Sequence, residues 1–152
     1  MTKLTCVVPE YDPLGPLVSD TDVLYRVEQI IGYDSRRDRS LWLFFLGADA
    51  VQLPVVVTLD DVPAYPVPGA AASICEMTGR VLASAAPGGS VVITLVPENE
   101  RGGADCDQQW TSALRAAAAR AGVHLRMICL AATEGVRRLE PSADPSHLLA
   151  ED

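Results

Sequence analysis

The stretch "LWLFFLG", Leu41 to Gly47, decides the fold of this chain. It is a short, continuous apolar run rich in aromatic residues, which is typical of a β-strand buried on both faces. A second apolar run, "LPVVVTL", follows after the turn residues Ala48 and Asp49. The two runs predict an antiparallel hairpin of Leu41–Leu46 with Leu53–Leu59, and three aromatic side chains of its first strand are expected in the core: Trp42, Phe44 and Phe45.

An amphipathic helix is predicted before the hairpin. Ser19 can cap its start, and the spacing from Ser19 to Asp22 resembles a capping box. Apolar residues then recur at helical spacing up to Ile31, and Gly32 suits the left-handed position that ends a helix.

Two further helices are predicted after the hairpin. The second runs from about Gly69 to Ala86, and the third runs from Gln108 to Ala121, where Asp107 can cap the start and Gly122 can end it. Apolar runs predict the remaining strands, which are "LTCVV" near the start of the chain, "VVITLV" after the second helix, "VHLRMICLA" after the third, and "VRRLE" as an edge strand.

This order of elements predicts the fold class. After an N-terminal arm the order is α-β-β-α-β-α-β-β, which indicates a single layered α/β domain with a mixed, mostly parallel sheet flanked by about three helices. Right-handed crossovers should make the strands that begin at Leu53, Val91 and Leu125 parallel. We expect a proline-rich arm at residues 1–18, the α/β domain at 19–140, and an acidic, flexible tail at 141–152.

Composition limits the classes of function. The chain has 152 residues and a net charge of −8, so binding to nucleic acid is disfavoured. No apolar run reaches the roughly 18 residues that a membrane span needs, and we expect neither a membrane segment nor a signal peptide.

The four cysteines are widely spaced, which argues against a zinc site and favours reduced thiols in the cytoplasm. Cys106, which lies between two aspartates, is expected to be exposed.

The loop "GYDSRRDRS" holds a dense basic cluster in an otherwise acidic chain: Arg36, Arg37 and Arg39. One interpretation is a solvated turn after a helix, where the helix dipole favours cations. The other is a site that binds an anion or an acidic partner.

A second candidate site consists of carboxylates that follow two strands: Asp60, Asp61 and Glu98. Ligands of open α/β sheets bind beyond the carboxyl ends of parallel strands, and carboxylate oxygens are the ligands that Mg²⁺ prefers. The alternative is that these residues are solvated loop acids and charges that flank helices. The sequence has no phosphate-binding glycine motif and no arrangement that favours a catalytic triad, so no catalytic residue is assigned.

Several segments together resemble a known family. These are "VEQIIGY", "SLWLFFLG", "VVVTLDDVP" and "ALRAAAARAGVHLRMICLAATEG", which span roughly Ser19 to Glu140. They resemble an uncharacterised actinobacterial α/β family known as a domain of unknown function. The resemblance implies an intracellular α/β protein, with no catalytic residues to carry over. The sequence departs from the family pattern at "RRDR", where the loop is expanded and Ser35 stands near the family's proline.

Three hypotheses of function follow. The first is a cytoplasmic, non-enzymatic binding or regulatory module that self-associates or binds a protein partner, and that needs no cofactor. The second is a Mg²⁺-dependent phosphoryl or nucleotide hydrolase that uses Asp60, Asp61 and Glu98, with Arg36 or Arg37 on the phosphate. The third is a small-molecule effector-binding domain, which would have an enclosed apolar pocket near the same strand ends.

Overall fold

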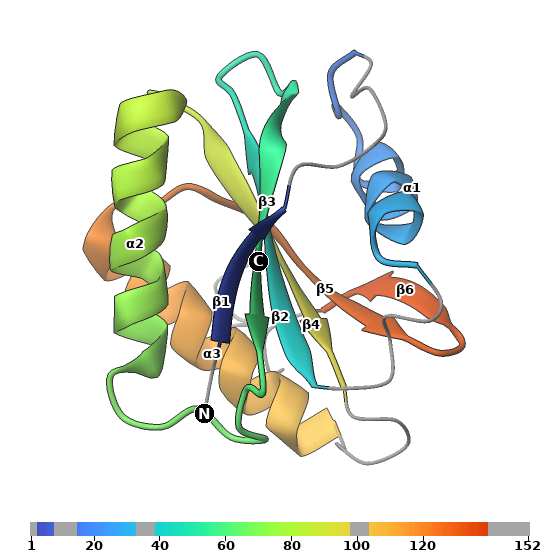
Figure 1. Ribbon diagram of the computed structural model, residues 1–152, viewed down its shortest axis with the longest axis vertical. Helices are drawn as coiled ribbons and strands as arrows, with labels where there is room; N and C mark the ends of the chain where they lie inside the picture. The colour runs from blue at the N-terminus through green and yellow to red at the C-terminus, as the bar shows by residue number, and fades with distance from the viewer. Residues whose placement is uncertain (1–2, 8–14, 33–38, 98–103, 140–152) are drawn as a thin grey trace, which may run out of the picture.

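The predicted hairpin lies in the middle of the sheet in the computed structural model (Figure 1). The structure describes residues 3–7, 15–32, 39–97 and 104–139, with the backbone alone for residues 3–7 and 104. Along the chain its elements are β1 (Lys3–Val7), α1 (Asp20–Ile30), β2 (Ser40–Leu46), β3 (Gln52–Asp60), α2 (Ala70–Ala85), β4 (Ser90–Val96), α3 (Ala104–Ala121), β5 (Leu125–Ala132) and β6 (Gly135–Arg138). The predicted order of elements is confirmed, and the strand of the N-terminal arm joins the sheet as β1.

The strand order among the described residues is β1-β3-β2-β4-β5-β6. The sheet is mixed, as predicted, but the expectation of a mostly parallel sheet is wrong. Of the five pairings between these strands, β4 with β5 is parallel and the other four are antiparallel. The reason is the position of β2, which pairs with both β3 and β4: Ser40 lies opposite Asp60 on one side and opposite Val96 on the other.

The direction of the strands matters more for function than their pairing. Because β3 and β4 are both antiparallel to β2, they run in the same direction, and β5 is parallel to β4. The prediction that the strands at Leu53, Val91 and Leu125 share one direction is therefore confirmed. Their carboxyl ends lie at one edge of the sheet, which is where open α/β sheets bind ligands.

Helices cover both faces of the sheet. Helices α2 and α3 lie on one face and α1 lies on the other (Figure 1). Side chains of β2 alternate between two cores: Leu41, Leu43 and Phe45 join the core under α2 and α3, and Phe44 joins the core under α1. Phe45 on one face is 0% exposed and Phe44 on the other is 2% exposed, so this strand is buried on both faces as predicted, although Trp42 is only partly buried.

The ends of the helices confirm some of the predicted signals. Ser19 caps α1 through the full capping box with Asp22, and Gly122, at a φ of 70°, follows the end of α3. Gly32 is not in the left-handed conformation that we expected, because the capping residue of α1 is Ile31 in extended backbone. Helix α3 begins at Ala104, so Asp107 lies inside the helix and does not cap it.

Ion pairs connect the start of α1 to β5 and β6, the last two strands in the order of the sheet. Arg126 of β5 and Arg138 of β6 each place a guanidinium nitrogen 2.8 Å from a carboxylate oxygen of Asp20. Arg126 also donates a hydrogen bond to the carbonyl of Val18. The hydrogen bond from Arg126 is the main reason that the pKa of Asp20 is lowered, despite partial desolvation. Among the described helices, none has the length and apolarity that crossing a bilayer requires.

Two glycine substitutions test how closely the chain packs, one at the start of β4 beside β2 and one inside α2. They are expected to change the free energy of unfolding in opposite directions. A Cβ at Gly89 would lie 2.2 Å from the carbonyl oxygen of Leu46, so Gly89→Ala should destabilise the fold by about 1–3 kcal/mol. A Cβ at Gly79, inside α2, would meet only Val123, at 3.5 Å, so Gly79→Ala should stabilise by up to about 1 kcal/mol. Urea unfolding measures both changes, and a stable Gly89→Ala variant would contradict the close approach of β4 to β2.

Candidate functional site

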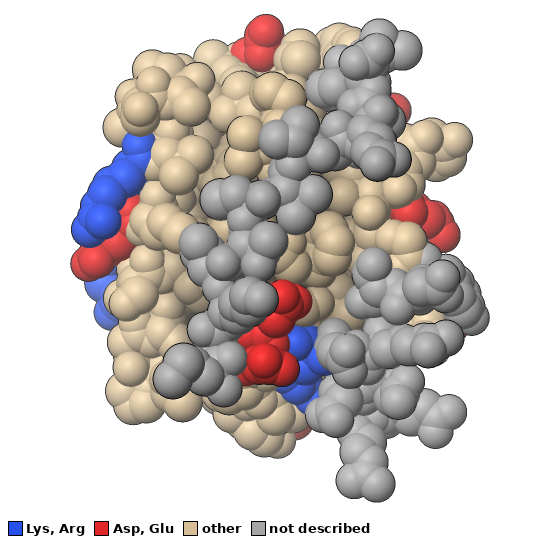
Figure 2. All heavy atoms as spheres, viewed as in Figure 1, with Lys and Arg blue, Asp and Glu red and all other residues tan. Residues whose placement is uncertain are grey.

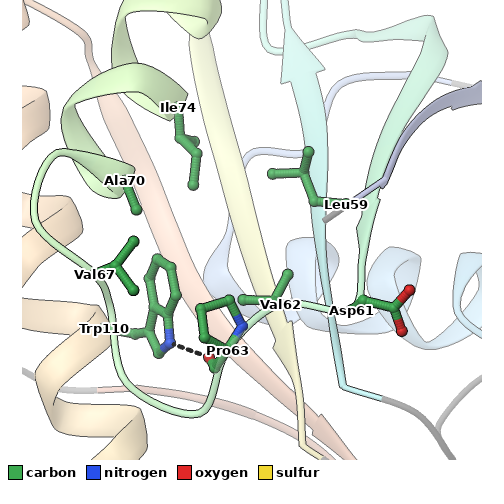
Figure 3. Close-up of a pocket in the computed structure, with 8 residues that line it drawn as sticks. All are labelled: Leu59, Asp61, Val62, Pro63, Val67, Ala70, Ile74 and Trp110. Atoms are coloured by element: carbon green, nitrogen blue, oxygen red, sulfur yellow. Dashed lines mark hydrogen bonds between the residues drawn. The ribbon is translucent and has the colours of Figure 1, made fainter. Parts of the chain in front are cut away.

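A pocket of about 460 Å³ lies at the edge of the sheet where β3 ends. Its walls come from the end of β3, the connection that follows, the start of α2 and one residue of α3 (Figure 3). The lining residues are Leu59, Asp61, Val62, Pro63, Val67, Ala70, Ile74 and Trp110. This size falls in the range of small-molecule sites, roughly 300–1,000 Å³.

The connection from Asp61 to Gly69 forms the outer wall of the pocket. Its position is fixed by its own restricted backbone and by hydrogen bonds with α3. Asp61 has a left-handed φ of 57°, which turns the chain out of β3, and three prolines restrict the backbone after it. The indole N–H of Trp110 donates a hydrogen bond to the carbonyl of Pro63 at 3.1 Å. The hydroxyl of Tyr65 donates another to Asp105 at 3.0 Å, so α3 holds this connection at two points.

The inner surface of the pocket is apolar. Apart from Asp61, every lining side chain is aliphatic or aromatic. Figure 3 shows the carboxylate of Asp61 pointing away from Val62 and Trp110, and the indole N–H of Trp110 is already paired with Pro63. A group bound here would therefore be recognised by shape and by burial of apolar surface, which contributes about 25 cal/mol per Å².

A small crevice adjoins the pocket and shares two of its lining residues, Val62 and Trp110. It measures about 10 Å³ and is also lined by Arg39, Ser40, Leu95, Val96, Pro97 and Asp107. Arg39 and Ser40 stand at the start of β2, and Leu95 and Val96 end β4. The crevice thus lies over the same edge of the sheet, one strand further along.

The carboxyl of Asp107 is the buried titratable group of this crevice. Asp107 is 7% exposed, and burial raises the pKa of its carboxyl even though Arg39 and Arg137 act in the opposite direction.

On the neighbouring connection, hydrogen bonds with Cys106 and Asp105 raise the pKa of Tyr65 to about 12, so Tyr65 remains a hydrogen-bond donor at neutral pH.

The predicted arginine cluster is only partly described. Arg39 is half-buried and lines the crevice, so the structure brings this arginine to the edge of the sheet where ligands are expected. Arg36 and Arg37 lie outside the described residues. In Figure 2, both acidic and basic atoms appear over the lower ends of β2 and β3, and most of the described surface on this face is uncharged.

The predicted carboxylate cluster is not brought together by the described residues. Asp60 is the last residue of β3 and Asp61 lines the pocket with its carboxylate turned outward, while Glu98 lies outside the described residues. Within residues 3–7, 15–32, 39–97 and 104–139, no group of three His, Cys, Asp or Glu side chains is placed to hold a metal ion. The Mg²⁺ site with Glu98 stays a prediction.

Sequence reasoning missed most of the pocket. Val62, Pro63 and Val67 belong to the segment "DDVPAYPVP", whose prolines indicated a connection but not a binding wall. Cys106 is 6% exposed, contrary to expectation, because α3 begins earlier than predicted and turns this residue toward the core. The same early start buries Asp107. Trp110 lines the pocket, and Tyr65 lies on the connection beside it.

A second hollow of about 320 Å³ lies at the opposite end of α2 and α3. It is lined by the ends of the two helices and by the turn before β4, with Leu82, Val123 and His124 among its residues. Glycine and alanine supply six of its ten lining residues. It serves as an internal reference for binding at the first pocket.

The buried carboxyl of Asp107 predicts that Asp107→Asn and the parent protein differ in stability by an amount that depends on pH. Because the folded chain binds this proton more tightly than the unfolded chain, Asp107 lowers stability as pH rises above its ordinary pKa of 3.8. Asp107→Asn should therefore be more stable than the parent at about pH 7 and equal to it below about pH 3.8. Urea unfolding across this range, with the exposed Glu76→Gln as a charge-matched control, measures the difference. An Asp107→Asn variant that is less stable at neutral pH would contradict the assignment.

Comparison of the chain with known proteins adds no relative. No protein-family model, no curated protein and no solved structure matches it. The resemblance to an actinobacterial domain of unknown function therefore stays a prediction, and the function must be inferred from the geometry of the pocket and the crevice.

Proposed function

We propose that this protein is a non-enzymatic binding module that takes up a small apolar ligand in the pocket beside Trp110. The observation that supports the proposal most strongly is the apolar lining at the carboxyl ends of the strands, at the edge of the sheet where such folds bind ligands. The hypothesis of a small-molecule effector domain predicts an enclosed apolar pocket near these strand ends; this pocket is apolar and lies there, but it is open to solvent on one side. No catalytic arrangement is part of the proposal.

The way the pocket is built supports binding rather than chemistry. Its outer wall is held by the hydrogen bonds from Trp110 to Pro63 and from Tyr65 to Asp105, so the cavity exists before a ligand arrives. A preformed cavity reduces the ordering cost of binding. The free thiols of Cys75, Cys106 and Cys129 support a reducing compartment, and the proposal therefore includes a cytoplasmic location.

A protein partner is the second candidate. Tyr65 and Val67, on the outer wall, are 49% and 54% exposed, and they belong to the few large apolar side chains exposed among the described residues. A partner that inserts an apolar side chain into the pocket would cover both, and a second copy of this chain is one such partner. Light scattering at increasing protein concentration separates self-association from binding of a small ligand.

The test of the proposed function uses a neutral apolar probe, 4-phenylbutyramide. A contribution of about 0.3 kcal/mol per non-hydrogen atom gives about 4 kcal/mol for its roughly twelve atoms, which corresponds to a Kd on the order of 1 mM. Saturation-transfer NMR measures affinities in this range. We expect the probe to bind the parent protein.

A matched pair of α2 variants locates the binding. Ala70 lines the pocket, and Ala72 lies exposed in the same turn of the same helix. Ala70→Phe should fill the pocket and abolish binding of the probe, whereas Ala72→Phe should leave it unchanged. Circular dichroism shows whether both variants fold. Equal binding of the probe to both variants, or binding to neither the parent nor Ala72→Phe, would refute the proposed function.

A further inference from the structure

The apolar pocket and the crevice are neighbours whose linings carry different chemical groups. Val62 and Trp110 line both, so a ligand seated against the indole of Trp110 contacts a side chain that also borders the crevice. The pocket offers apolar walls, and the crevice offers Arg39 and the carboxyl of Asp107. A ligand that uses both must combine an apolar body with one polar end.

The balance of charge at the crevice favours a negative end. Arg39 lines it, and Arg137 is close enough to act on the carboxyl of Asp107. Asp107 opposes these two cations, but its burial disfavours the ionised form. Among the described acids at this edge, the carboxylate of Asp61 points away from the pocket, Asp105 accepts the hydrogen bond from Tyr65, and Asp60 ends β3 opposite Ser40.

The size of the crevice limits what the negative end can be. A space of about 10 Å³ accommodates about one water-sized atom, so it fits one oxygen of a ligand. A carboxylate can place one oxygen there. Its planar shape also matches the fork of donors on a guanidinium, which has five N–H groups and can serve more than one partner.

We infer that the ligand of this pocket is a carboxylic acid with a compact apolar body, and that Arg39 binds its carboxylate. The inference rests on the proposed function, because it names the chemical class of the ligand for the same pocket. The apolar body contacts Trp110 and the aliphatic walls, and the carboxylate reaches the crevice past Val62. Arg39 thereby gains a specific role within the predicted arginine cluster.

Three probes with one apolar body test the charge of the ligand. These are 4-phenylbutyrate, its neutral amide 4-phenylbutyramide, and the cation 4-phenylbutylamine. A charge-assisted hydrogen bond to Arg39 should make the carboxylate bind about tenfold more tightly than the amide. The amine should bind no more tightly than the amide, because Arg39 and Arg137 repel it. Saturation-transfer NMR titrations give the three values of Kd.

A pair of charge-matched variants assigns the effect to Arg39. Arg39→Gln removes one positive charge at the crevice, and Arg120→Gln removes one at the exposed, far end of α3. Both variants change the net charge equally, so they differ only in where the charge is lost. The tenfold preference for the carboxylate should vanish in Arg39→Gln and persist in Arg120→Gln, and the affinity for the amide should stay the same in both.

The outcomes separate this inference from the proposed function. If the amide binds and the carboxylate binds no more tightly, the pocket stands and the carboxylate inference fails. A tighter amine, or a preference that survives in Arg39→Gln, also overturns the inference. If none of the three probes binds the parent protein, the proposed function fails together with the inference. Arg39→Lys provides a second check, because it keeps the charge and loses the fork, and it should retain only part of the preference.

Discussion

The constraint on which the rest of the structure depends is the burial of β2 on both faces. Its side chains alternate between two cores, and its backbone pairs with β3 on one side and β4 on the other. A strand of this composition cannot be the outermost strand of a sheet, because its apolar side chains and backbone groups would remain exposed. Since β2 is antiparallel to both neighbours, β3 and β4 must run in the same direction. The carboxyl ends of β3, β4 and β5 therefore meet at one edge of the sheet.

The pocket follows from what the chain must do at that edge. After β3 it has to leave the sheet and reach α2, and it does so through the left-handed Asp61 and a proline-rich connection. Trp110, 47 residues away from Pro63, fixes that connection to α3. The space between the connection and the two helices is lined by apolar side chains. Arg39 stands at the same edge because it directly precedes β2, so one constraint places both halves of the proposed ligand site.

Local patterns predicted most of the elements, whereas long-range packing set the parts that the sequence did not predict. The hairpin, the capping box at Ser19 and the glycine end of α3 each depend on residues close together in the chain. The insertion of β2 between β3 and β4 depends on the pairing of Ser40 with Val96, which no local pattern reveals. The dense cluster of arginines predicted a candidate site that includes Arg39, but the position of Arg39 beside the apolar pocket depends on Val62 and Trp110. The burial of Asp107 was missed because α3 begins before the predicted cap.

The central claim is that the edge formed by the ends of β3 and β4 is a ligand site. A methyl NMR map of the protein with 4-phenylbutyrate tests it most directly, because apolar residues line both the pocket beside Trp110 and the second hollow at the far ends of α2 and α3. The largest shift changes are expected at Leu59, Val62, Val67 and Ile74, and little change is expected at Leu82 and Val123. Shift changes centred on Leu82 and Val123, or spread evenly over both hollows, would contradict the claim.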